Sequence, residues 1–316
     1  MTRTLSLLTP SGRLTLGSYL GALLPMSHRQ DDAFYGVADL HAMTTDHDPR
    51  LLRAYTDEIA TLFLAAGLDR ATLFRQSRVP AHAQLAYLLE CTASTGELNR
   101  MIQFKEKGRG VDSTRVSLYT YPALMAADIL LYRPAQVPVG ADQRQHVELT
   151  RDLALRFNRR YGEVFTVPEV VTAADGSARV MDLLHPTRKM SKSADAAGSV
   201  YLLDPPDVVR RKVARAVTDS ETGPGAVRTD AAKPGVTNLL AILAACGGSA
   251  DGITTYGALK RAVTDAVVAE LEPLRKRYAE LAADPAYVTA VLERGAERCR
   301  EVTAPVLAAA QAAIGI

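Results

Sequence analysis

Two lysines stand close together in a short polar stretch, Lys189-Met190-Ser191-Lys192-Ser193. It follows the apolar run at residues 180–184 and the turn residues His185-Pro186-Thr187. Lysine ammonium groups are compact, mobile charges, and serine hydroxyls are donors, so such a loop can bind along a polyphosphate. The stretch has no glycine-rich frame, so it is not a Walker-type loop. The competing interpretation is a solvated basic loop without a ligand.

A second candidate phosphate site lies near the N-terminus. A strand predicted at residues 4–8 runs through Thr9-Pro10-Ser11-Gly12 and Leu14-Thr15-Leu16-Gly17-Ser18 into a helix predicted at residues 19–26. The N-terminal end of a helix presents free N–H groups and a positive dipole end, which favours anions. Gly17 would let the backbone approach a nucleotide, while Thr15 and Ser18 offer hydroxyls. A plain N-capped helix would also explain Ser18.

One carboxylate stands alone in an apolar helix. Asp128 lies within residues 121–132, among Leu124, Met125, Ile129 and Leu131. Burying a carboxylate is costly unless it caps a helix, pairs with another group or binds a ligand. From the spacing alone, structural pairing and ligand recognition both stay open.

A strand end and helix start at residues 137–146 carry further candidate ligands. Gly140 allows close approach of adenine or ribose, Asp142 can accept from ribose hydroxyls, and Gln143 can hold an ammonium group. His146 is expected to be an internal helical histidine, because no His or Cys partner has metal-ligand spacing. No metal site is predicted. His41, just after a predicted strand, is either a core-edge histidine or part of a pocket.

These segments together resemble the class I aminoacyl-tRNA synthetases, and most closely the bacterial tryptophanyl-tRNA synthetases. Lys189 to Ser193 spell the K-M-S-K-S loop, and residues 10–21 are similar to the P-S-G-x-x-T-x-G-N-Y-x-G form of the H-I-G-H motif. Residues 121–128 resemble Y-P-x-L-M-A-A-D, residues 137–143 resemble V-P-V-G-x-D-Q, and residues 104–107 spell F-K-E-K. The resemblance covers nearly the whole chain.

The resemblance implies a role for each matching residue. Asp128 would accept the indole N–H, and Met125 favours tryptophan because the tyrosyl enzymes have Gln there. The implied catalytic residues are Lys107, Lys189 and Lys192. The implied ATP-binding residues are Thr9, Ser11, Gly12, Thr15, Gly17, Ser18, Gly140, Asp142, Val180, Met190 and Ser191. The implied tryptophan-binding residues are Leu5, His41, Tyr121, Met125, Asp128, Ile129, Val139 and Gln143.

The function implied is tryptophan–tRNA ligation. L-tryptophan would react with ATP, accompanied by Mg²⁺ without a dedicated protein site, and the tryptophanyl group would pass to tRNA(Trp). A tyrosyl-tRNA synthetase and a non-catalytic paralogue that binds tryptophan or tRNA are the two alternatives. Leu7, Thr9 and Ser18 depart from the family pattern. They leave open whether the chain is a housekeeping enzyme or an auxiliary copy with an altered inhibitor response.

The predicted elements form two groups. Strands are predicted at residues 4–8, 34–39, 71–76, 136–139, 165–167 and 178–181, and helices at 19–26, 48–66, 81–91, 123–132 and 142–161. Only helices are predicted afterwards, at 206–217, 238–245, 256–282 and 285–312. The alternation indicates an α/β fold with a parallel sheet. The resemblance implies a Rossmann-like doubly wound catalytic domain at 1–184 and an all-helical anticodon-binding domain at 185–316. The last helix is a candidate to pack back on the catalytic domain.

Composition limits the class of protein. The 316 residues are 47% hydrophobic and 23% charged with a net charge of +2, which is typical of a soluble globular chain. tRNA contact would therefore need local basic patches, such as residues 210–215 and 275–277. Cys91, Cys246 and Cys299 are expected to be reduced, buried thiols of a cytoplasmic protein. No signal peptide or membrane span is predicted, and the resemblance implies a homodimer.

Overall fold

The computed structural model describes residues 3–101, 114–134, 136–139, 144–172, 180–191 and 197–316. Its strands are β1 (Thr4–Leu8), β2 (Ala33–Val37), β3 (Thr72–Arg75), β4 (Gln136–Val139) and β5 (Glu169–Thr172). Strands β1, β2 and β3 form a parallel sheet in that order, and β4 pairs in parallel with β5. In the register, Leu8 lies opposite Val37 and Val37 opposite Arg75. The carboxyl ends of the three strands therefore meet at one edge, where ligands bind in open α/β sheets.

The helices fall into an N-terminal and a C-terminal set. The N-terminal set is α1 (Leu16–Ser18), the π-helix η1 (Tyr19–Leu23), α2 (Leu24–Ser27), α3 (Asp39–Ala42), α4 (Pro49–Ala65), the 3₁₀ helix η2 (Gln76–Arg78), α5 (Ala81–Glu90), α6 (Thr95–Leu98), α8 (Val116–Tyr132) and α9 (Arg144–Tyr161). The C-terminal set is α10 (Pro206–Ala214), α11 (Pro234–Ala245), α12 (Tyr256–Ala282) and α13 (Pro285–Ile314).

Local chemistry explains where α4 begins and which face it buries. The Asp48 carboxylate accepts from the backbone N–H of Arg50 at 2.6 Å, and Pro49 occupies the first helical position. Both features stabilise a helix start, because the first N–H groups have no partner within the helix. The face that carries Ile59, Leu62 and other apolar side chains is fully buried. This helix was predicted within one residue at each end.

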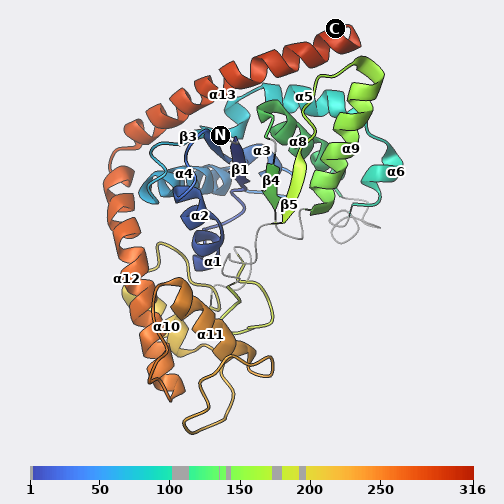
Figure 1. The fold of residues 1–316 in the computed structure, drawn as a ribbon. Coiled ribbons are helices and arrows are strands. Elements are labelled where there is room, and N and C mark those ends of the chain that lie inside the picture. The colour runs from blue at the N-terminus through green and yellow to red at the C-terminus, as the bar shows by residue number, and fades with distance from the viewer. Residues whose placement is uncertain (1–2, 102–113, 135, 140–143, 173–179, 192–196) are drawn as a thin grey trace.

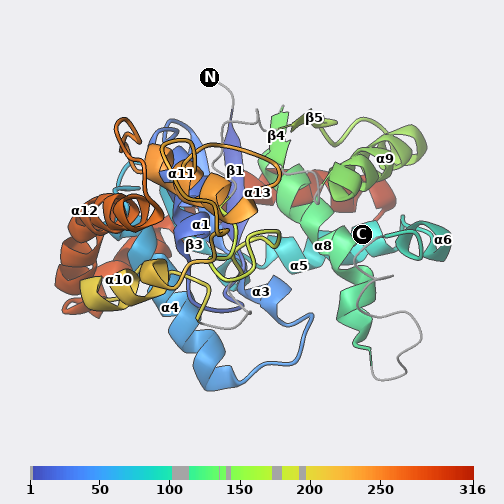
Figure 2. The same cartoon turned by 90° about the horizontal axis from the view of Figure 1, so that it is seen from below.

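The sheet separates two groups of helices, and the last helix bridges them. Figures 1 and 2 show α4 and α12 on one side of β1 and α8 and α9 on the other. Helix α13 runs back from the C-terminal set and packs on β3, α5 and α8. One cluster of buried apolar side chains continues from β2 and α4 through Val180 and Met190 into α10, α11 and α12. The proposed boundary near residue 185 thus has buried contacts across it. None of the described helices combines the length and apolarity needed to cross a bilayer.

One predicted strand is wrong. Residues 165–167 form no strand, and the partner of β4 is β5, which begins at Glu169. The side-chain oxygen of Asn158 accepts from the backbone N–H of Phe165, and its amide donates to the Phe165 carbonyl. The Phe165 ring packs against Phe157 with centroids 4.8 Å apart. The backbone groups that a strand would use are therefore satisfied by a side chain. Of the strand predicted at residues 178–181, Met181 lies in an isolated bridge, and residues 178–179 lie outside the described ranges.

The prediction of three buried thiols is also wrong in part. Cys299 is buried and Cys246 partly so, but Cys91 is exposed at the end of α5. Burial raises the pKa of the Cys246 and Cys299 thiols to about 12, with Glu270 adding to the effect at Cys246. Both therefore stay in the thiol form at neutral pH, and neither is a nucleophile.

Candidate active site

The two segments predicted to bind phosphate lie against each other. The backbone N–H of Leu16 donates to the Val200 carbonyl at 2.8 Å, and Thr15 bridges to Tyr201. A Cβ atom on Gly17 would lie 3.4 Å from the Cβ of Val180 and 3.8 Å from that of Met190. These are ordinary van der Waals distances, so the first turn after β1 lies against the base of the 189–193 loop.

The turn at Thr15 is a capping box. The Thr15 side chain accepts from the N–H of Ser18, and the Ser18 hydroxyl accepts from the N–H of Thr15. This reciprocal arrangement fixes the start of α1. It continues directly into the π-helix η1, a rare local geometry that occurs often at functional sites. Both hydroxyls are used within the turn, so their contact with phosphate stays a prediction.

A short β-ladder forms the base of the lysine loop. Met181 bridges to Lys189, and the Met190 N–H donates to the Val180 carbonyl at 3.1 Å. The Met190 side chain is buried, whereas Lys189 is exposed. The methionine therefore anchors the loop and leaves the lysine free to project. Lys192 and Ser193 lie outside the described residues, and the Ser191 carbonyl accepts from the Ser199 hydroxyl.

Asn238 of α11 clamps this ladder. Its side-chain oxygen accepts from the Met181 N–H, and its amide donates to the Met181 carbonyl, both at 2.9 Å. Asn238 is buried, so both groups would lose a partner if the side chain were shortened. Asn238 begins the helix predicted at residues 238–245, and nothing in the sequence marked it as a partner of the lysine loop.

We expect Asn238→Ala to raise the KM for ATP about 30-fold and to change the KM for tryptophan less than about twofold, since two buried hydrogen bonds contribute ~1 kcal/mol each. Steady-state kinetics with each substrate varied in turn measures this. Thr237→Ala is the matched control, because the Thr237 hydroxyl donates to the Asp230 carbonyl instead of Met181. Equal increases in both KM values would show that Asn238 does not act through the loop.

Asp128 is the centre of a buried polar cluster. Its Oδ1 accepts from His82 Nδ1 at 2.6 Å and from Gln76 Nε2 at 2.8 Å. Its Oδ2 accepts from His41 Nε2 at 2.7 Å and from the same Gln76 nitrogen at 2.9 Å. The donors come from the residues that follow β2 and β3 and from α5. Structural pairing, one of the two interpretations left open by the sequence, is therefore present.

Asp128 is held in its ionised form. Burial alone would raise its pKa, but the hydrogen bonds from His41 and His82 outweigh burial and lower the pKa of Asp128 to about 2. An unfolded aspartate has a pKa near ~3.9. Since the folded pKa is the lower one, this carboxylate stabilises the fold fully above about pH 4. That contribution is lost as the pH falls towards 2.

We expect the stability difference between the wild type and Asp128→Asn to shrink by about 2 kcal/mol as the pH falls from 5 towards 2, because only the wild type loses this contribution. Urea unfolding at pH 5, 4 and 3 measures the difference. A difference that stays constant over this range would mean that Asp128 has an ordinary pKa in the folded chain.

The apolar residues predicted to contact tryptophan gather beside this cluster. Leu5 and Met125 pack against buried Ile129, together with Val137 and Val147. The Tyr121 ring lies edge-on to His41 with centroids 6.1 Å apart, and its hydroxyl forms a hydrogen bond with His146. His146 is thus an internal helical histidine, as predicted. Five residues predicted to contact the amino acid therefore lie together with Asp128.

Several predicted residues lie outside the described ranges. They are Lys107, Gly140, Asp142, Gln143 and Lys192. The side chain of Val139, at the end of β4, is likewise not described. Thr9, Ser11 and Gly12 follow β1 at the same sheet edge as His41. Within the described part of the chain, no three His, Cys, Asp or Glu side chains gather to hold a metal ion.

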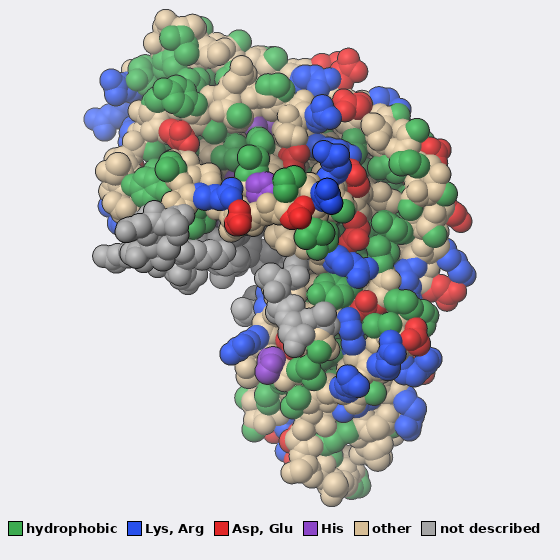
Figure 3. Space-filling model, turned by 180° about the vertical axis from the view of Figure 1, so that it is seen from behind, with side chains coloured by type: hydrophobic (Ala, Val, Ile, Leu, Met, Phe, Trp, Pro, Cys, Tyr) green, Lys and Arg blue, Asp and Glu red, His purple; other side chains and the backbone are tan. Residues whose placement is uncertain are grey.

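The basic residues of the C-terminal helices differ in what they contact. The Lys212 ammonium donates to the Asp204 carboxylate at 2.7 Å and to the Ser199 carbonyl, and Arg275 donates to the Asp204 carbonyl. These two therefore hold the fold together. Arg210 and Arg215 are exposed on and just after α10. On the face shown in Figure 3, basic side chains lie interspersed with acidic ones, and the molecule is hollowed between its two parts.

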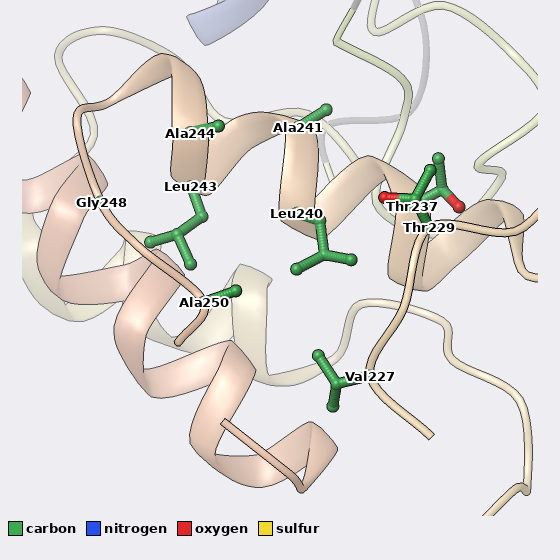
Figure 4. Close-up of a pocket in the computed structure, with 9 residues that line it drawn as sticks. All are labelled: Val227, Thr229, Thr237, Leu240, Ala241, Leu243, Ala244, Gly248 and Ala250. Carbon is green, nitrogen blue, oxygen red and sulfur yellow. The ribbon is translucent and has the colours of Figure 1, made fainter. Parts of the chain in front are cut away.

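A cavity of about 460 Å³ lies on α11, away from Asp128. Its walls are mostly apolar, with Val227, Leu240 and Leu243 prominent, and the hydroxyl groups come from Thr229 and Thr237 (Figure 4). It holds no ionised side chain, so it lacks the groups that activation of a substrate would need.

The chain matches known proteins along its length. Residues 2–277 match the family model described as tRNA synthetases class I (W and Y). "Tryptophan–tRNA ligase 1" of Streptomyces avermitilis is 52% identical over 332 residues, covering 100% of this chain and 99% of that protein. Tryptophanyl-tRNA synthetase from Mycoplasma pneumoniae has a TM-score of 0.89 at 36% identity, covering 100% of this chain and 98% of that one. The Campylobacter jejuni enzyme, complexed with ADP and tryptophan, has a TM-score of 0.85 at 31% identity, covering 99% and 100%.

Proposed function

Because the chain belongs to the class I tRNA synthetases of the tryptophan and tyrosine (W and Y) family, we propose a function within that family from the site itself. The function is tryptophan–tRNA ligation: L-tryptophan and ATP give tryptophanyl-adenylate and pyrophosphate, and the tryptophanyl group then passes to tRNA(Trp). The observation that carries the choice of amino acid is the single ionised carboxylate of Asp128 beside an apolar wall of Leu5, Met125 and Ile129. An indole ring needs one acceptor for its N–H and apolar surface elsewhere.

In this proposal the amino acid enters between α3 and α8. Asp128 accepts the indole N–H, while Tyr121 and His41 line the ring and the Met125 thioether contacts its face. Gln143 holds the ammonium group. A pocket that offers an acceptor rejects phenylalanine strongly, because the acceptor would lose its partner; such losses reach roughly 10⁴–10⁵-fold.

The chemical step needs no protein nucleophile. The tryptophan carboxylate attacks the α-phosphorus of ATP in line, the bond to the β-phosphate oxygen breaks, and pyrophosphate leaves. Lys107, Lys189 and Lys192 stabilise the charge on the departing pyrophosphate, so positioning and electrostatics supply the rate enhancement. The closeness of Gly17 to Val180 and Met190 supports this role, because two neighbouring segments can reach the same nucleotide.

The remaining ATP contacts are those that the family resemblance implies. Thr9, Ser11, Gly12, Thr15 and Ser18 meet the triphosphate. Gly140 and Asp142 meet the adenosine. Mg²⁺ binds with the phosphates and neutralises part of their charge. We assign no separate protein site to it.

tRNA binding and dimerisation complete the proposal. Residues 1–184 form the catalytic domain and 185–316 the anticodon-binding domain, where the exposed Arg210 and Arg215 are available to phosphates. We also propose a homodimer, as the family resemblance implies; Tyr87 on α5, Val116 on α8 and Leu155 on α9 are exposed apolar side chains that a partner could cover. The enzyme acts in the cytoplasm, where tRNA is charged.

Pyrophosphate exchange tests the assignment. Labelled pyrophosphate should be incorporated into ATP when tryptophan is present. It should not be incorporated with tyrosine or without an amino acid. Exchange with tyrosine would identify a tyrosyl enzyme. Tryptophan binding without exchange would identify a non-catalytic paralogue. Charging of tRNA(Trp) by the same preparation tests the second step.

A further inference from the structure

Two buried residues behind Asp128 determine which of its oxygens can meet a ligand. His82 and Gln76 are both 0% exposed, and both donate to Oδ1. Oδ2 instead faces His41, whose side chain is 14% exposed. Gln76 contacts both oxygens through one nitrogen, at 2.8 and 2.9 Å, so it does not distinguish them. The two oxygens differ in their histidine partner: that of Oδ1 is fully buried, and that of Oδ2 is partly exposed, so Oδ2 is the oxygen on the accessible side.

A second hydrogen bond fixes the orientation of each donor, Gln76 and His82. The Gln76 side-chain oxygen accepts from the Leu40 N–H at 3.2 Å, so its amide nitrogen must point to Asp128. The other ring nitrogen of His82, Nε2, lies 3.0 Å from the Tyr132 hydroxyl. An ionised carboxylate only accepts, so Nδ1 of His82 carries a proton and donates to Asp128; in a neutral imidazole Nε2 then accepts from the Tyr132 hydroxyl.

Burial keeps the Tyr132 hydroxyl protonated. Burial, with Cys299 and Asp128 adding to it, raises the pKa of the Tyr132 phenol far above its usual value. Its ring is packed against Phe34 and Phe74, with centroids 5.1 and 5.8 Å away, and it is 0% exposed. Tyr132, His82 and Asp128 thus form a directed hydrogen-bond chain that ends on Oδ1.

We propose that His82, held by Tyr132, is a positioning residue for amino-acid specificity: it holds Oδ1 of Asp128 from the buried side and so leaves Oδ2, whose histidine partner is partly exposed, as the acceptor for the indole N–H. This inference rests on the proposed role of Asp128. It assigns His41 as the donor that the indole N–H joins or displaces, because His41 is the partly exposed partner of Oδ2.

The test compares tryptophan with β-(3-benzothienyl)-L-alanine, in which sulfur replaces the indole N–H. Dissociation or inhibition constants for the two compounds give the N–H preference of each variant. Tyr132→Phe removes only the hydroxyl, His82→Phe removes both hydrogen bonds, and His82→Asn keeps a donor near the Nδ1 position. Tyr35→Phe is the matched control, because Tyr35 is an equally buried tyrosine whose hydroxyl donates to the Arg29 carbonyl instead.

We expect His82→Phe to lower the N–H preference at least about 30-fold through tighter relative binding of the analogue, with His82→Asn restoring most of it. Tyr132→Phe should lower the preference about fivefold, and Tyr35→Phe should leave it unchanged. The KM for ATP should change little in any of them. A variant that merely disturbs the fold would weaken both compounds alike. If His82→Phe does not fold, Tyr132→Phe decides the question: an unchanged preference overturns the inference.

Substitutions of Asp128 distinguish the positioning role of His82 from the proposed role of Asp128 as acceptor of the indole N–H. Loss of the N–H preference in Asp128→Asn, with retention in the His82 and Tyr132 variants, would overturn only the positioning role. Retention of the preference in Asp128→Ala, which has no side-chain acceptor, would overturn the role of Asp128 itself, and the inference with it.

Discussion

Asp128→Asn should lower kcat/KM for tryptophan in pyrophosphate exchange by about 10³-fold, while the KM for ATP changes less than about threefold. The amide that replaces one carboxylate oxygen is itself a donor, and it would face His41, His82 or Gln76, all of which donate to this residue now. Removing one partner from a buried charged cluster costs roughly 3–5 kcal/mol, and a thousandfold loss corresponds to ~4 kcal/mol. Fluorescence or isotopic exchange kinetics with tryptophan varied measures the effect.

Asp46→Asn provides the surface control for this substitution. Asp46 is 96% exposed and pairs only with Arg115 among the described contacts, so its activity should stay within about twofold of the wild type. A tryptophan KM within threefold of the wild-type value in Asp128→Asn would remove Asp128 from the amino-acid site. In that case the His41–Asp128–His82 cluster would be purely structural.

The sequence predicted most of the elements because their signals are local. Strands β1 and β4 and helix α12 begin and end where the hydrophobic pattern and turn residues placed them. The strand predicted at residues 165–167 fails because the competing partner, the Asn158 side chain, lies within the same stretch of chain but outside any strand pattern. Periodicity does not report hydrogen bonds between a side chain and a backbone.

The site was predictable only in part. Asp128 was singled out because an isolated acid in an apolar helix needs a partner, and that argument requires no knowledge of the fold. Its partners Gln76 and His82 were missed, since they follow β3 and lie on α5, 52 and 46 residues away. A single sequence contains no signal for such a pairing. The contact between Gly17 and the base of the lysine loop was foreseen only through the family resemblance.

Gly295 is the point at which the C-terminal helix α13 packs directly on the backbone of β3. It lies in the middle of α13, where glycine costs about 1 kcal/mol relative to alanine. A Cβ atom there would lie 1.8 Å from the Leu73 carbonyl oxygen and 2.7 Å from its carbon. Leu73 belongs to β3, the edge strand of the sheet, so α13 covers an edge that would otherwise be open. Only glycine fits here, because the backbone of α13 at Gly295 lies directly against the backbone of β3 at Leu73.

Gly295→Ala should accordingly destabilise the protein by about 3 kcal/mol in urea unfolding, despite the better helix propensity of alanine, because neither backbone can yield without separating α13 from β3. Gly257→Ala is the matched control: its Cβ would meet only the Arg261 guanidinium at 3.7 Å, so stability should stay equal or rise. Since Gln76 directly follows β3 and holds Asp128, the folded fraction of Gly295→Ala should also show a raised KM for tryptophan. Unchanged stability in Gly295→Ala would mean that α13 does not lie against β3 in solution, and the path from the last helix to the amino-acid site would then not exist.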